Sequence, residues 1–115
     1  MNEEKLHKIR DTISKYAKAK SERVYLSEYR KSLKAIMMKE AETQGVKTLS
    51  AQERDAYSSD KYIELLNVLK EATEIEEKYK WSLMILQQEL EMEKANIYQT
   101  TAEMKNYSNN QQFSK

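Results

Sequence analysis

Apolar residues recur through the second half of the chain at spacings that alternate between four and three residues. The run comprises Leu65, Leu69, Ala72, Glu76, Tyr79, Leu83, Leu86, Leu90, Glu93, Ile97, Thr100 and Met104, and nine of these twelve positions are apolar. This spacing is typical of a coiled coil, because it keeps one stripe of side chains on one side of a long helix. A stripe of this length needs a partner along it. We therefore expect a hairpin or oligomer interface formed by Leu65, Leu69, Tyr79, Leu83, Leu86, Leu90 and Ile97.

The first half of the chain contains two shorter apolar stripes. One comprises Leu6, Ile9, Ile13 and Tyr16, and the other comprises Leu26, Tyr29, Leu33 and Ile36. The two stripes are out of register and the residues between them are polar, so we expect the apolar face to shift or the helix to bend near residues 18–23. Tyr16 and Tyr29 lie on the stripes and are expected in the core, whereas Tyr25 is expected to be more exposed.

Few residues mark the ends of helices, because the 115-residue chain contains no proline and only one glycine, Gly45. Gly45 predicts the end of a first helix over about 3–43, since glycine adopts the left-handed conformation that often follows a helix. Ser50 and Glu53 have the spacing of a capping box, which predicts a short helix over about 50–57. Asp60 is suited to the start of the main helix, over about 60–106.

Together these features predict an all-α protein, a long antiparallel helical hairpin or coiled coil with a short connecting helix, in one domain over residues 1–106. The tail, residues 107–115, carries no charge before its final residue and has no apolar period, so we expect it to be disordered. Further apolar residues lie outside the main stripe, namely Ile63, Leu66, Val68, Ile75, Met84, Ile85 and Met92. They widen the apolar face beyond what one partner helix covers, so we expect a homo-oligomer.

The net charge of +1 hides an unequal distribution. Residues 1–48 carry 12 Lys and Arg against 7 Asp and Glu, whereas residues 49–115 carry 8 against 12. The cations of the first half alternate with tyrosines, a combination typical of single-stranded nucleic-acid binding, in which cations contact phosphates and rings stack on bases. The candidate nucleic-acid-binding residues are Lys18, Lys20, Arg23, Arg30, Lys31, Lys34 and Lys39. The alternative is a set of ordinary surface charges that pair with Glu71, Glu74, Glu76 and Glu77 across the hairpin.

No motif for catalysis or metal binding is evident. The chain has no cysteine, and His7 is its only histidine, so the usual thiolate and imidazole ligand sets cannot form. Phosphate-binding glycine loops and nucleophile motifs are also missing from the sequence. We therefore expect no enzymatic activity, no cofactor and no metal. No apolar run approaches the roughly 18 residues of a membrane span, and the first residues do not form a signal peptide, so we expect a cytoplasmic protein without membrane contact.

Several segments resemble a group of small phage proteins encoded among recombination genes. They are residues 25–35 (YLSEYRKSLKA), residues 40–42 (EAE), residues 53–57 (ERDAY), Tyr62 and residues 76–81 (EEKYKW). The order of a basic helix, a break with glycine and a long helix with heptad spacing is also similar to the UvsY family of recombination mediators from T-even-type phages. The similarity covers about residues 20–106.

The resemblance implies a ring-forming homo-oligomer that binds single-stranded DNA and helps to load a recombinase or annealing protein onto it. A recombinase or a single-strand-binding protein would be a further partner. The family's DNA-contacting segment is a Leu-Lys-Ala-Arg stretch, which Leu33, Lys34 and Ala35 match, but Ile36 stands in place of the arginine, so only Lys34 is carried over. Two other functions remain open. The chain could bind a host protein as an adaptor or inhibitor, through its acidic helix or Trp81, or it could be a structural coiled-coil subunit.

Overall fold

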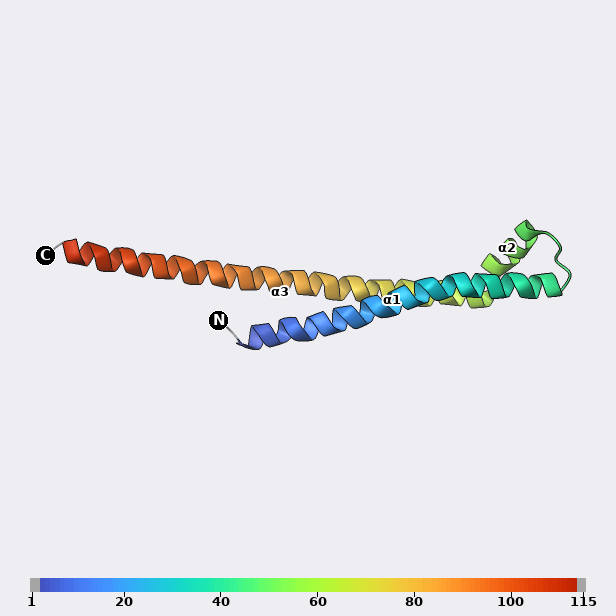
Figure 1. Ribbon diagram of the computed structural model, residues 1–115, viewed down its shortest axis with the longest axis horizontal. Helices are drawn as coiled ribbons and strands as arrows, with labels where there is room; N and C mark the ends of the chain where they lie inside the picture. The colour runs from blue at the N-terminus through green and yellow to red at the C-terminus, as the bar shows by residue number, and fades with distance from the viewer. Residues whose placement is uncertain (1–2, 114–115) are drawn as a thin grey trace.

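The computed structural model of the chain describes residues 3–113, and the side chains of residues 3–108. It contains the helices α1 (Glu3–Thr43), α2 (Leu49–Ser58) and α3 (Asp60–Phe113). Helices α1 and α3 lie antiparallel, and α2 packs at the end where the chain turns (Figure 1). The molecule measures 99 × 23 × 15 Å. The prediction of an elongated, all-α helical hairpin is confirmed.

Gly45 ends α1 in the way that the sequence predicts. Its φ is +100°, in the left-handed region that favours glycine. The Gly45 amide donates to the Glu42 carbonyl over 3.1 Å, and the Val46 amide donates to the Ala41 carbonyl over 3.0 Å. These two hydrogen bonds form a Schellman motif, which satisfies carbonyls at the end of the helix and reverses the chain.

The caps of α2 and α3 differ from those that the sequence predicts. Thr48, in an extended conformation, is the N-cap of α2, and its hydroxyl accepts a hydrogen bond from the Ala51 amide over 3.2 Å. Ser50 therefore lies inside the first turn and is not the cap. Similarly, the Ser59 hydroxyl accepts from the Tyr62 amide over 3.3 Å, so Ser59 rather than Asp60 caps α3. In both cases the cap is the last extended residue, because only that backbone directs its oxygen at the free amides.

Helix α1 is continuous from Glu3 to Thr43, and its buried stripe keeps its spacing, so the shift of the apolar face predicted near residues 18–23 is wrong. The bend predicted there as the alternative stays a prediction. The residues that face α3 continue through this segment as Tyr16, Ala19, Arg23 and Leu26, at spacings of three and four. Ala19 is buried, and Arg23 forms an ion pair with Glu76 of α3. The apolar pattern missed this continuity because an alanine and an arginine occupy the stripe where large apolar residues are expected.

The continuous stripe changes the positions of the tyrosines. Tyr29 and Ile36 lie beside the stripe rather than on it, and both are exposed, so the prediction that Tyr29 is a core residue is wrong. Tyr16 is half-buried, and Tyr25 is 67% exposed, as the sequence predicts.

The best-packed part of the core lies at the turn end, where three helices meet. Buried side chains from all three helices form one cluster of Leu33, Met37, Ala56, Tyr62 and Leu65. Further along the hairpin only α1 and α3 remain, and the stripe residues Leu69, Tyr79, Leu83, Leu86 and Leu90 are half-buried. Two helices cover the large leucine side chains of this stripe less completely than three helices do, although Ile9, Ala19, Ala72 and Glu76 are buried there as well.

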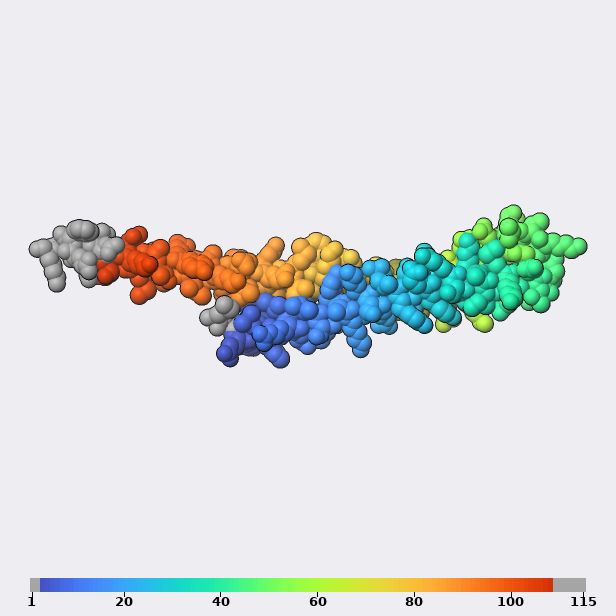
Figure 2. All heavy atoms as spheres, in the orientation of Figure 1, coloured from blue at the N-terminus to red at the C-terminus, as the bar shows by residue number. Residues whose placement is uncertain are grey.

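Helix α3 is longer than its partner. The Nζ atom of Lys5 lies 3.6 Å from carboxylate oxygens of both Glu89 and Glu93, so α1 starts beside this part of α3. Helix α3 continues beyond it to Phe113. As far as residue 108, this part lies clear of α1 and is one helix wide (Figure 2). The helix thus includes residues 107–113, where the sequence predicts a disordered tail, because neither proline nor glycine is present to end it. Residues 114–115 lie outside the described part.

Candidate nucleic-acid interface

The seven predicted cations do not lie on one face of the hairpin. Arg23 lies between α1 and α3, and Lys34 lies against α2. Lys20, Lys31 and Lys34 share one side of α1, since spacings of 11 and 14 residues correspond to about three and four helical turns. Lys18 lies on the opposite flank, beside Lys15, Glu22 and Ile75. The seven predicted cations therefore lie on different surfaces of the hairpin and do not form one patch.

Arg23 is occupied by a bidentate ion pair. Its Nε donates to Glu76 Oε2 over 2.5 Å, and its Nη2 donates to Glu76 Oε1 over 3.0 Å. Glu76 is only 6% exposed, and a carboxylate at this depth needs such a partner. These hydrogen bonds lower the pKa of Glu76 and raise the pKa of Arg23. Arg23 is therefore engaged inside the hairpin and is not available to a phosphate.

Lys20 of α1 and Lys80 of α3 both lie close to the same carboxylate. After Arg23, their positive charges are the next electrostatic contributions that lower the pKa of Glu76. Both lysines are exposed, and neither forms an ion pair within the described part of the chain. The negative charge of Glu77 also acts on Arg23. Three cations therefore face two carboxylates here, which leaves a surplus of one positive charge. This flank of the hairpin carries surplus positive charge from both helices.

Lys34 connects α1 to α2. Its Nζ lies 3.2 Å from Glu53 Oε1 and 4.9 Å from the centre of the Tyr57 ring. The interactions with Tyr57 and Glu53 raise the pKa of Lys34. Tyr57 is exposed, and its ring is held in an edge-on contact with Tyr62, with ring centres 5.2 Å apart. Lys34 therefore lies over one face of a ring that is 46% exposed.

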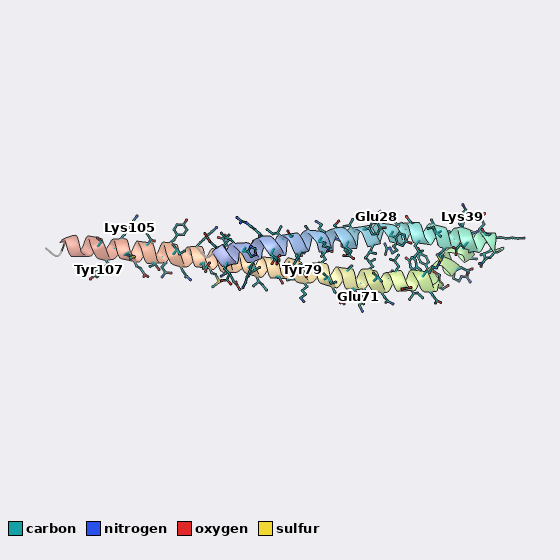
Figure 3. The ribbon with its side chains drawn as sticks, turned by 90° about the horizontal axis from the view of Figure 1, so that it is seen from below. Glu28, Lys39, Glu71, Tyr79, Lys105 and Tyr107 are labelled. Atoms are coloured by element: carbon teal, nitrogen blue, oxygen red, sulfur yellow. The ribbon has the colours of Figure 1, made fainter. Side chains whose placement is uncertain are left out.

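The remaining cations differ in their surroundings. Lys31 pairs with Glu28 of the same helix over 3.3 Å, an exposed pair that solvent weakens. Within residues 3–108, Lys18, Arg30 and Lys39 form no ion pair. Figure 3 shows Glu28 and Lys39 on the side of α1 that faces away from α3.

Tyr25 and Tyr29 stack on each other with ring centres 6.3 Å apart and an interplanar angle of 8°. Tyr29 lines a hollow together with Lys61 and Val68 of α3, on the same flank as Lys18. The tyrosine pair is therefore separated from Lys20 and Lys34. We call the set of Lys20, Lys31, Lys34 and Lys80, with Tyr57, the basic side.

Sequence reasoning missed two members of the basic side. Lys80 lies on the acidic half of the chain, and the only signal for it is its position one turn after Glu76, beside the apolar stripe. Tyr57 lies on a different helix from Lys34, and no sequence spacing predicts their contact.

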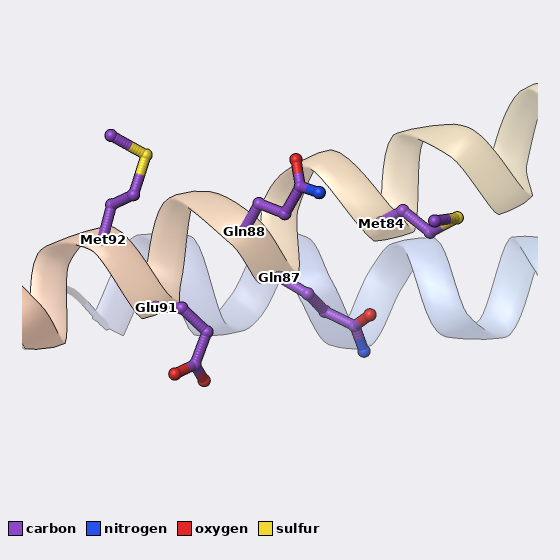
Figure 4. A pocket seen from close by; sticks show the side chains of 5 residues that line it. All are labelled: Met84, Gln87, Gln88, Glu91 and Met92. Carbon is purple, nitrogen blue, oxygen red and sulfur yellow. The ribbon is translucent and has the colours of Figure 1, made fainter.

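An open hollow of about 500 Å³ lies on α3 and is lined by Met84, Gln87, Gln88, Glu91 and Met92 (Figure 4). Among the described residues, no group of three or more His, Cys, Asp or Glu could hold a metal ion. None of the helices described is long and apolar enough to cross a membrane.

No protein-family model matches the chain, and neither a curated protein nor a solved structure matches it.

Proposed function

We propose that the protein is a non-enzymatic phage recombination accessory protein that binds single-stranded DNA along the basic side. In this role it assists the loading of a recombinase or annealing protein. The resemblance of about residues 20–106 to phage recombination proteins supports the recombination context. The observation that carries DNA binding is the surplus charge around Glu76, where Lys20 and Lys80 add to an Arg23 that is already neutralised.

Phosphate contacts would supply most of the affinity. Binding releases counterions from the strand, so the binding constant falls as salt is added. The logarithm of the binding constant falls by about 0.7 per log unit of salt concentration for each phosphate neutralised on a single strand. Lys20 and Lys80 form no ion pair, and Lys31 forms only an exposed one, so two or three phosphates per chain give an expected slope of about −1.5 to −2. Tyr57, held beside Lys34, offers a ring on which one base can stack, which would favour a single strand over a duplex.

Self-association would strengthen such weak sites. A few cations per chain bind a short strand poorly, but a second chain that holds the same strand acts at a high effective concentration. The proposal therefore includes a homo-oligomer, in which several basic sides contact one strand.

The test is fluorescence anisotropy of a labelled single-stranded oligonucleotide, titrated with protein at about 50 mM and about 200 mM salt, with duplex as the comparison. The test variant changes Lys20, Lys31 and Lys80 to Gln. Lys34 is left intact because it also holds Glu53 and Tyr57. The matched control changes Lys8, Lys61 and Lys78 to Gln, which removes the same charge from the other flank and the outer surface. Circular dichroism checks that both variants keep their helical content.

We expect the test variant to bind at least about tenfold more weakly, and the control to change by less than about threefold. Equal weakening of both variants would show that general charge, not the basic side, binds DNA. Absence of binding by the unmodified protein at low salt would refute the proposed function. The adaptor and structural functions would then remain.

A further inference from the structure

The α1 stripe that faces α3 contains two arginines. From residue 16 onward its positions, at spacings of three and four, are Tyr16, Ala19, Arg23, Leu26, Arg30, Leu33 and Met37. Ala19, Leu26 and Leu33 line hollows on the flank opposite the basic side. The alternate positions, which include Arg23 and Arg30, therefore form the edge of the stripe next to the basic side. The two arginines lie on one line of the helix, because they are seven residues apart.

Only one of these two arginines has a counter-ion. Arg23 is paired with Glu76. Because α3 runs antiparallel to α1, the register of this pair places Leu69, seven residues before Glu76, opposite Arg30. Leu69 carries no charge, and Arg30 forms neither a hydrogen bond nor an ion pair within residues 3–108. Arg30 is therefore a half-buried guanidinium without an anion.

An arginine at this position destabilises the fold unless an anion binds it. The next two stripe residues, Leu33 and Met37, are buried in the three-helix cluster, and an apolar residue at position 30 would extend that cluster. A guanidinium there loses part of its water and gains no carboxylate in return. Natural proteins break the apolar pattern in this way mainly at functional sites. The position of Arg30 therefore points to a ligand from outside the chain.

The groups near Arg30 are suited to a phosphate. Ser27 lies one turn before Arg30 on the same helix and is half-buried, and its hydroxyl forms no hydrogen bond within residues 3–108. Lys34 lies one turn after Arg30. Glu64 and Glu71 are the nearest acidic residues on either side of Leu69 along α3, and both line hollows on the opposite flank. An anion at Arg30 would thus meet hydrogen-bond donors and positive charge there.

We propose that Arg30 and Ser27 form a phosphate site in the middle of the basic side, which holds one backbone phosphate of the single strand. The planar fork of Arg30 donates two hydrogen bonds to two phosphate oxygens, and the Ser27 hydroxyl donates a third. The site lies ten residues, about 15 Å, from Lys20 and one turn from Lys34, so it connects the two ends of the basic side. This inference rests on the proposed function and names the contact that fixes the position of the strand.

Two substitutions of Arg30 separate this site from general positive charge. Arg30→Gln removes the charge and the fork, whereas Arg30→Lys keeps the charge and loses the fork. In the anisotropy titration with single strand, we expect Arg30→Gln to bind at least about tenfold more weakly and Arg30→Lys at least about fivefold more weakly. Arg10→Gln and Arg10→Lys are the matched controls, because Arg10 is an exposed residue of α1 without an ion pair within residues 3–108. We expect each control to change by less than about twofold, and circular dichroism checks the helical content of all four variants.

The lysine variant decides between the two explanations. Full affinity in Arg30→Lys would show that only charge matters at this position, which would overturn the phosphate site and leave the proposed function standing. Equal losses in the Arg10 and Arg30 variants would also overturn it.

A second measurement needs no DNA. The chain has four arginines, Arg10, Arg23, Arg30 and Arg54, so their Nε–H signals can be assigned in an NMR spectrum of the ¹⁵N-labelled protein. On titration with inorganic triphosphate, we expect the Arg30 signal to shift at least about threefold more than the Arg10 signal. A shift that does not favour Arg30 would overturn the phosphate site. If Arg30 responds to triphosphate but the unmodified protein binds no single strand, the proposed function alone is refuted, and the ligand of the site is a free phosphate compound.

Discussion

Replacing Leu65 by Ala should destabilise the protein far more than replacing Leu90 by Ala, although both are stripe residues of α3. Leu→Ala removes three carbon atoms, and each buried CH₂ contributes about 0.8 kcal/mol. Leu65 is 8% exposed in the three-helix cluster, so it loses nearly all of that transfer energy and leaves a cavity. The expected loss is about 3 kcal/mol. Leu90 is half-buried beside α1 alone, where truncation leaves a surface dent, so we expect a loss of about 1 kcal/mol.

Urea unfolding monitored by circular dichroism at 222 nm measures the difference, with all proteins at one concentration because association adds to apparent stability. At a slope of about 1.5 kcal/mol per molar urea, the midpoints should fall by about 2 M for Leu65→Ala and about 0.7 M for Leu90→Ala. Equal shifts, or a larger shift for Leu90→Ala, would refute the reasoning. The well-packed core would then not lie at the turn end.

Other variants test individual contacts of the fold. Thr48→Ala should lower the free energy of unfolding by about 1 kcal/mol, and Ser50→Ala by much less, because the Thr48 hydroxyl caps α2. Equal losses for the two variants in urea unfolding would contradict this assignment. The pKa of Glu76 is lower in the folded protein than in the unfolded chain, where it is about 4.5. The ion pair therefore stabilises the fold fully above pH 4.5, and this contribution is lost as the pH falls through the folded-state pKa of Glu76. Thus the melting temperature should fall less between about pH 6 and about pH 2.5 in Glu76→Gln than in the unmodified protein, and identical falls would count against this ion pair.

The sequence determined the fold class through the residues it lacks and the spacing it keeps. Without proline and with Gly45 as its only glycine, the chain has one strong interruption, and that residue ends α1. The 4-3 spacing of the α3 stripe calls for a long partner helix, and the first helix supplies it because the chain folds back after Gly45. Periodicity and backbone preference act locally, so they can be read from sequence.

Apolar spacing and backbone preference did not predict the details of the interface between the helices. Ala19 and Arg23 continue the α1 stripe because the partner surface presents Ala72 and Glu76 opposite them. An alanine or an arginine carries no apolar signal of its own. Only the register of α1 against α3 shows that Ala19 is buried and that Arg23 is paired with Glu76.

The candidate site depended on tertiary structure even more. From sequence, seven cations of the first half formed one set, yet the hairpin neutralises Arg23 and places Lys18 on the opposite flank from Lys20. It also adds Lys80, a cation from the acidic half, to the basic side. The sequence by itself determined that the chain forms long helices with cations concentrated on the first. The tertiary structure alone decided which of those charges meet a partner, because pairing depends on distances of a few ångströms between helices that the sequence separates by some fifty residues.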